Sequence, residues 1–258
     1  MRRTIDRPEL LDGPLDDPEM LRGNLRDLRR INHRLGGVRL SAAALEALVG
    51  TAGRAVVPPE EAPGARATIH MLDVGTGAAD IPVALIRRSR GGPRHDGEPW
   101  LQVTGIDDRL EVLDAARTLG PGLSAAVSSG ALTLEVGDGR LLPYPDDSFD
   151  VAHCSLVVHH LAPDAAGAML REMARVARSG IIVNDLVRGR LSLVGAWALT
   201  RLMTRNVYTR HDAPLSVRRA YTRAELRSMI EAAGLVITWE SGGLLGHRWA
   251  VAARRPTR

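Results

Sequence analysis

Apolar and polar residues alternate in blocks along most of the chain, and the blocks have the lengths of strands and helices. Between residues 66 and 185, short apolar runs are each followed by a stretch with helical periodicity. The predicted strands are 68–74, 101–106, 132–136, 149–155 and 181–185, and the predicted helices are 78–88, 109–119 and 163–177. Because such alternation is typical of a parallel sheet with helices on both faces, we expect an α/β core.

The segment before this core predicts a helical cap over residues 1–56. Its apolar residues recur at helical spacing up to Gly36-Gly37, and Ser41 is expected to cap a second helix. A proline-rich linker is predicted at 57–65, and a flexible loop at 89–99.

The segment after the core departs from the alternation as well. Residues 186–221 predict a lid-like insertion, in which an apolar helical stretch is followed by a polar loop. Thr222 and Glu225 form a capping-box pattern at the start of a last helix, and a hairpin is expected to complete residues 222–258. We expect residues 1–258 to be a single domain.

Composition narrows the class of protein. Of the 258 residues, 45% are hydrophobic and 25% are charged, which is ordinary for a globular protein. No apolar run approaches the roughly 20 residues that span a bilayer, and the start of the chain lacks the apolar segment of a secretory signal. The single cysteine, Cys154, fits a reducing compartment. We therefore expect a cytoplasmic location and no integral membrane contact.

Charge does not point to nucleic acid, although the formal net charge is +4. All 34 basic residues are arginines, and they are interleaved with 30 acidic residues instead of forming a stripe. Aromatic residues make up only 3% of the chain, so platforms for stacking bases are scarce. We expect a small-molecule partner and no nucleic acid, and a homodimer remains open.

The strongest signal for a binding site is LDVGTGAAD at 72–80, where the first predicted strand meets its helix. Gly75 and Gly77 allow the backbone to turn sharply and approach a ligand. A dinucleotide-binding fingerprint would need a third glycine where Asp80 stands, and the carboxylates of Asp80 and Asp73 would repel a pyrophosphate. The same acids suit a ligand that carries an ammonium and a sulfonium group.

Further polar residues follow the next strands, at the edge of the sheet where open α/β folds bind ligands. Asp107, with Asp108 beside it, ends the second strand, and a carboxylate there can accept hydrogen bonds from both hydroxyls of a ribose. Asp138, after the third strand, is placed to accept from an adenine amino group, and Gly139 allows close approach. Ser155, at the end of the fourth strand, is expected to line the floor of the pocket.

Together these motifs resemble the class I S-adenosylmethionine (SAM)-dependent methyltransferase family over about residues 66–185. The resemblance implies a Rossmann-like sheet of seven strands with the last strand antiparallel, an N-terminal helical cap and a helical insertion after strand five. It implies SAM as cofactor and S-adenosylhomocysteine as product. It also implies that Gly75, Thr76 and Gly77 cradle the methionine portion of SAM, and that Asp73 orients this turn.

Within that family, GDGRLLPYPDDSFD at 137–150 and VVHHL at 157–161 look like the ubiquinone/menaquinone-methyltransferase-like group. LRDLRRINHRLGG and TRHDAPLSVRRAYTRAEL resemble a bacterial branch that tailors polyketide and phenolic metabolites. The ubiquinone O-methyltransferases carry acids after strand four that can hold a divalent metal, where this chain has Leu156 and His159. We therefore expect no metal requirement.

Histidines are the candidate catalytic residues, because methylation of a hydroxyl needs a base with a pKa near neutral pH. His159 and His160 follow the fourth strand. Adjacent side chains usually diverge, so we expect one of them to face the pocket and the other to make a structural hydrogen bond. His211, beside Asp212 in the insertion, is the third candidate. Structural roles for all three remain open.

Three functions remain as alternatives. The leading prediction is O-methylation of an aromatic or polyketide-type hydroxyl in secondary metabolism. The nearest alternative is C-methylation of a quinone or phenol precursor, which uses the same fold and base, and the third is a SAM-binding protein without transfer activity. The apolar stripe over 197–203 has three interpretations: packed core of the lid, lining of the acceptor site, or contact with a partner subunit or a membrane surface.

Overall fold

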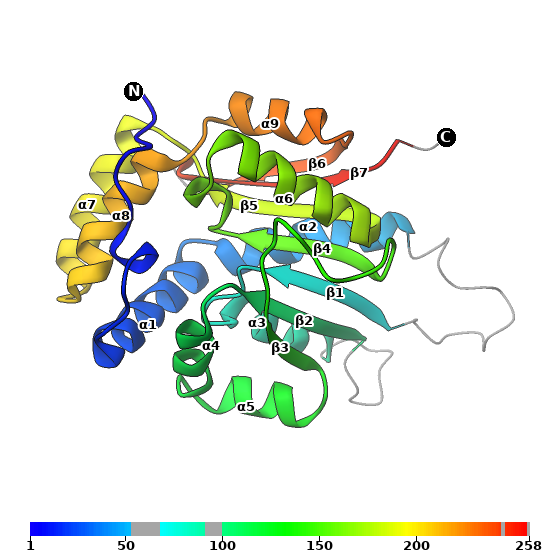
Figure 1. Cartoon of the computed structure of the whole chain (residues 1–258), viewed down its shortest axis with the longest axis horizontal. Coiled ribbons are helices and arrows are strands. Elements are labelled where there is room, and N and C mark those ends of the chain that lie inside the picture. Colours follow the sequence, from blue (N-terminus) through cyan, green and yellow to red (C-terminus); the bar gives the residue numbers. More distant parts are fainter. Residues whose placement is uncertain (53–67, 91–99, 244–245, 257–258) are drawn as a thin grey trace, which may run out of the picture.

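Seven strands form a single mixed sheet in the computed structural model, which describes residues 1–52, 68–90, 100–243 and 246–256. The strands are β1 Ile69–Val74, β2 Leu101–Asp107, β3 Leu132–Val136, β4 Phe149–Ser155, β5 Ala177–Leu186, β6 Val236–Gly242 and β7 Arg248–Arg254. Their order is β3-β2-β1-β4-β5-β7-β6 (Figure 1). The first five strands run parallel, and β7 pairs antiparallel with both β5 and β6. The predicted α/β sheet with an antiparallel last strand is confirmed.

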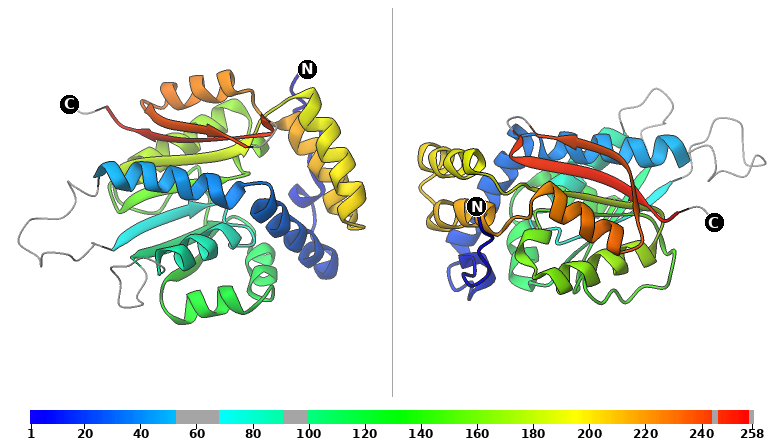
Figure 2. Two further views of the ribbon diagram at one scale, coloured as in Figure 1. Left: turned by 180° about the vertical axis from the view of Figure 1, so that it is seen from behind. Right: turned by 90° about the horizontal axis from the view of Figure 1, so that it is seen from above.

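Helices cover both faces of this sheet (Figure 2). On one face, α2 Gly37–Ala52, α3 Asp80–Ser89 and α5 Pro121–Ser128 bury their apolar residues against β1 and β2. On the other face, α6 Pro163–Val176 and α9 Arg223–Ala232 pack over β4, β5 and β7. The middle strands β4 and β5 are buried over most of their length, as is typical of parallel strands with helices on both faces.

Four further elements gather at the end of the sheet where the parallel strands terminate (Figures 1 and 2). They are the 3₁₀ helix η1 Leu10–Asp12, α1 Pro18–Arg34, α7 Arg190–Met203 and α8 Val207–Arg219. The helix α4 Leu110–Arg117 and the 3₁₀ helix η2 Val158–His160 border the same end. The N-terminal segment and the insertion after β5, which are far apart in sequence, thus lie together over the carboxyl edge of the sheet.

Three local predictions are wrong. The predicted polar loop after the apolar helix is the helix α8, which accommodates Pro214 and is capped by Asn206. Ser41 lies inside α2 instead of capping it, because the helix already begins after Gly36, at φ +87°. The helix α5 was not predicted at all. The capping box of Thr222 and Glu225 is present as expected, and the linker 57–65 and loop 91–99 lie outside the described residues.

The apolar stripe of the insertion is not a packed lid core. Within α7, which the structure describes in full, only Thr200 is buried. Trp197 is 52% exposed and Leu202 is 87% exposed. None of the helices in the described part of the chain has both the length and the apolar composition of a membrane span.

Candidate active site

The glycine turn between β1 and α3 lies at the carboxyl edge of the sheet. Gly75 and Gly77 have φ of +66° and +53°, a region that side chains rarely adopt. A Cβ on Gly75 would lie 2.4 Å from Cγ2 of Val157, whereas a Cβ on Gly77 would meet nothing within 4 Å. Gly75 therefore packs closely against the segment after β4, and Gly77 faces open space where a ligand can approach the backbone.

A buried hydrogen-bond chain holds this turn in place. The Asp73 carboxylate accepts from Thr76 Oγ1 at 2.7 Å and lies 2.5 Å from Nδ1 of His153 on β4. Nε2 of His153 is 2.8 Å from Oγ of Ser41, which also accepts from Nδ2 of Asn184 at 2.8 Å. Because a carboxylate only accepts, His153 donates through Nδ1. In the neutral ring, Nε2 then accepts the hydrogen bond of the Ser41 hydroxyl. The chain connects α2, β4 and β5 to the predicted orienting residue Asp73.

Asp107 connects the end of β2 to the same turn. One carboxylate oxygen accepts from the Gly77 amide at 2.9 Å, and the other accepts from the Arg109 amide at 3.1 Å. Burial raises the pKa of Asp107 to about 6, with the charges of Asp108 and Asp73 adding to the effect and the two amides opposing it. Each oxygen retains a free lone pair, so the group can still accept from ligand hydroxyls. Asp108 itself is exposed.

The two residues predicted to border an adenine already have partners within the protein. Asp138 accepts three hydrogen bonds from the Arg140 guanidinium and one from its amide, which lowers the pKa of this carboxyl group. Gly139 packs against Val74, since a Cβ would lie 2.4 Å from its Cγ1. Gly139 therefore allows the loop to approach β1, and Asp138 would have to share its carboxylate between Arg140 and a ligand.

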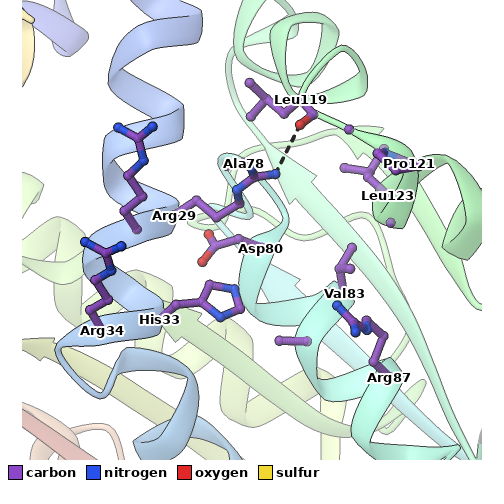
Figure 3. Close-up of a pocket in the computed structure, with 14 residues that line it drawn as sticks. Arg29, His33, Arg34, Ala78, Asp80, Val83, Arg87, Leu119, Pro121 and Leu123 are labelled. Atoms are coloured by element: carbon purple, nitrogen blue, oxygen red, sulfur yellow. Dashed lines mark hydrogen bonds between the residues drawn. The ribbon is translucent and has the colours of Figure 1, made fainter.

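A cavity of about 450 Å³ opens between α1, α3 and the start of α5 (Figure 3). Arg29, His33 and Arg34 of α1 line one side of it, and Asp80 projects between them from the first turn of α3. Asn32 donates to one oxygen of Asp80, while the other oxygen is buried and has no hydrogen-bond partner among the described residues. Burial raises the pKa of this carboxyl group. Asp80 is thus a carboxylate poised for a cationic partner.

The buried Arg248 of β7 joins the cap to the floor of the site. Its guanidinium is 1% exposed, donates twice to Asn32 Oδ1 at 3.0 Å, and lies 3.4 Å from Oγ of Ser155. Burial lowers the pKa of Arg248 to about 10, and the nearby carboxylates of Asp185 and Asp80 oppose the shift. Ser155, expected to line the pocket, lies beside this cation at the carboxyl end of β4.

The N-terminal strap, residues 3–15, crosses the carboxyl edge between α8 and the sheet. On one side, the amides of Leu10 and Leu11 donate to Asp212 of α8. On the other side, Arg109 donates to the carbonyl of Gly13, and Arg3 donates to the carbonyls of His159 and Leu161. The strap therefore encloses the end of the sheet at which the glycine turn and Asp107 meet.

Each predicted catalytic histidine has a carboxylate at Nδ1. His159 pairs with Asp185 and His160 pairs with Asp12 of the strap, at 2.7 and 2.8 Å. The expected divergence of the two rings is wrong, because η2 places them side by side, with centroids 4.3 Å apart and ring planes tilted by 35°. Burial lowers the pKa of His160, but the hydrogen bond to Asp12 and the charge of Glu9 outweigh it and raise the value.

The third histidine, His211, lies on a helix and not in a loop. Its Nδ1 is 2.7 Å from Asp212, and its side chain is 50% exposed. It lines a cavity of about 530 Å³ together with Trp197, Arg201 and the first residues of the strap. Because Asp212 holds the strap from the side of α8, this cavity lies on the opposite side of the strap from His160.

Several residues of the site could not be found by motif. Glu9 and Asp12 precede the first predicted helix, and Ser41, His153 and Arg248 lie within ordinary helical or strand patterns. Only the placement of β7 beside β5, and of the strap across the edge, brings them to the site.

We expect Ser41→Ala to lower the free energy of unfolding by about 1–3 kcal/mol, because it removes the partner of two buried polar groups. Urea denaturation measures the change. The exposed Ser128→Ala in α5 is the control and should stay within about 0.5 kcal/mol of the wild type. Equal stabilities of the two variants would show that the buried chain contributes nothing.

Comparison with known proteins identifies the type of domain. Residues 72–183 match a family model described as a methyltransferase domain. Over 111 residues the chain is 32% identical to demethylmenaquinone methyltransferase of Deinococcus radiodurans, covering 43% of this chain and 39% of that protein. Over 144 residues it is 31% identical to the ubiquinone/menaquinone biosynthesis C-methyltransferase UbiE of Bdellovibrio bacteriovorus, covering 56% and 54%. The matched region is thus about half or less of each relative.

The whole fold has relatives among solved structures. Human N-acetylserotonin methyltransferase in complex with SAM superimposes with a TM-score of 0.59 at 16% identity, covering 96% of this chain and 61% of that one. The family match lies over β1 to β5, the strands that carry the glycine turn, Asp107 and Ser155. Residues 72–183 therefore match a methyltransferase domain, and the chain resembles the class I, SAM-dependent methyltransferases of the UbiE-like group in sequence and in sheet topology.

Proposed function

We propose that the protein binds SAM at the carboxyl edge of the sheet and transfers its methyl group to a hydroxyl of a small aromatic or polyketide-type acceptor. The observation that carries the proposal is the joint position of the glycine turn and Asp107, linked by the hydrogen bond from the Gly77 amide. Ends of parallel strands at a crossover point are where open α/β sheets bind ligands.

The residues at this edge fit the parts of SAM. Asp107 would accept from the ribose hydroxyls, and the open space beside Gly77 admits the thioether region. The buried Asp80 oxygen without a hydrogen-bond partner among the described residues suits the ammonium of the methionine tail, and Arg29 and His33 across the cavity suit its carboxylate. When bound, SAM supplies the electrophilic methyl group, and these side chains hold it in place.

The acceptor's hydroxyl would approach from the segment after β4, where Val157 packs on Gly75 and η2 begins. The cluster of Glu9, His159 and His160, which we call the η2 cluster, is our proposed place for removing the proton of that hydroxyl. Carboxylates at both Nδ1 atoms leave the Nε2 atoms directed at Glu9, at 3.8 Å from its two oxygens. In-line transfer needs mainly positioning, which the strap and η2 would provide.

C-methylation is the second candidate. The names of the two curated relatives, a demethylmenaquinone methyltransferase and a C-methyltransferase, favour it. Carbon attack on a phenol or quinol precursor needs the same proton removal, so the geometry is compatible with both reactions. The position of the new methyl group therefore has to be measured.

Incubation with methyl-labelled SAM and a panel of phenolic and quinol acceptors tests the proposal. We expect S-adenosylhomocysteine together with a methylated product whose carbon chemical shift is that of a methoxy group. A C-methyl shift would support the second candidate. Binding of SAM without any product across the panel would favour a SAM-binding protein without transfer activity, and the absence of SAM binding would overturn the proposal.

Asp107→Asn should weaken SAM binding at least tenfold at pH 8, because charge-assisted hydrogen bonds worth about 1.4 kcal/mol or more are lost. In the wild type, affinity should fall as the pH drops through about 6, because protonation of Asp107 removes the charge that accepts from the ribose. Calorimetry from pH 5 to pH 8 measures both effects. Asp114→Asn, an exposed carboxylate on α4, is the control. Wild-type affinity in Asp107→Asn would exclude the ribose contact.

A further inference from the structure

The η2 cluster brings two imidazoles and one carboxylate together from distant parts of the chain. Glu9 belongs to the strap, and His159 and His160 belong to η2 after β4. One ligand atom of each residue, an imidazole nitrogen or a carboxylate oxygen, lies within 4.8 Å of the other two. Glu9 and His159 are buried, at 3% and 2% exposed, whereas the His160 side chain is 27% exposed, so the cluster lies mostly inside the protein with one side open to solvent.

The distances approach those of a metal site. Nε2 of His159 and Nε2 of His160 each lie 3.8 Å from an oxygen of Glu9. In a tetrahedral zinc site, bonds of 2.0–2.2 Å place such ligand atoms about 3.4 Å apart. The two imidazoles face different oxygens of Glu9, and the three ligand atoms lie within 4.8 Å of one another, so side-chain movements of up to about 1.4 Å would bring them onto one ion.

Each of the two histidines donates a hydrogen bond from Nδ1 to a carboxylate, as metal-bound imidazoles commonly do. Asp185 and Asp12 each accept from an Nδ1–H, which fixes the ring and leaves the Nε2 lone pair directed inward. Carboxylate–histidine pairs of this kind orient the ligands of zinc sites.

One buried carboxylate oxygen of the cluster has no hydrogen-bond partner in the described part of the chain, and a bound cation would interact with it. Oε1 of Glu9 is buried and has no hydrogen-bond partner among the described residues. The nearest cation is Arg219, whose Nε is 3.9 Å from that oxygen and whose guanidinium also pairs with Asp12. Because Arg219 is shared between Glu9 and Asp12, a bound cation would add positive charge beside the buried oxygen of Glu9.

We infer that Glu9, His159 and His160 bind a divalent transition-metal ion of the zinc class. Two imidazoles and a carboxylate are a ligand set for such ions, and three protein ligands leave a position open for water or a substrate oxygen. The ion would fasten the strap to η2. The inference rests on the proposed function only for the role of the ion, which would act where the acceptor's proton is removed; the sequence alone led us to expect no metal.

Metal content and calorimetry of the tag-free, full-length protein test the site. After dialysis against a chelator, the protein should take up about one Zn²⁺ per chain, and Co²⁺ in its place should give the visible absorption of a four-coordinate site. Glu9→Gln and His160→Asn should each weaken Zn²⁺ binding at least tenfold. Asp12→Asn, which changes only the outer partner, should weaken it about tenfold.

His211→Asn is the matched control, because His211 has the same Nδ1–carboxylate pairing but belongs to no such cluster. It should bind Zn²⁺ like the wild type. No uptake by the wild type, or equal affinity in the wild type, Glu9→Gln and His160→Asn, would overturn the inference. Circular dichroism identifies a variant that fails to fold, in which case the conservative Glu9→Gln alone decides. SAM affinity is measured on the same samples without metal, so failure of one proposal is distinguishable from failure of the other.

Discussion

The site depends on a single buried carboxylate, that of Asp73. Its two oxygens are occupied by Thr76 in the glycine turn and by His153 on the neighbouring strand. Breaking the hydrogen bonds of a buried charge costs free energy, so the position of Asp73 fixes the turn relative to β4. The glycine turn then presents the Gly77 amide to Asp107. This chain of hydrogen bonds thus sets the distance between the glycine turn and Asp107.

The second constraint is the cover over the carboxyl edge. The strap, α1 and α8 are joined to the sheet by polar contacts, including Asp12 to His160 and Arg248 to Asn32, and share a small apolar cluster with α4. Polar contacts at an edge can be exchanged for water more easily than an apolar core can be separated. A cover held in this way suits an enzyme that must admit and release two substrates, whereas the apolar core below stays closed.

Much of this arrangement follows from the sequence. The sequence predicts the strands and their parallel arrangement, because strands and helices have fixed periods. It also predicts the glycine turn and the positions of Asp73 and Asp107 at strand ends, because these are local motifs. The partners of those residues could not. Ser41 looks like a helix cap and no motif marks Glu9, because burial and pairing arise from tertiary contacts that a local pattern does not encode. The close contact between the two histidine rings of η2 likewise depends on one turn of 3₁₀ helix.

A crystal structure of the protein with S-adenosylhomocysteine tests the central claim most directly. The account predicts that both ribose hydroxyls lie within hydrogen-bond distance of Asp107, with the thioether beside Gly77 and the amino group on the side of Asp80. A nucleoside bound elsewhere on the molecule, or bound at this edge with its ribose away from Asp107, would contradict it.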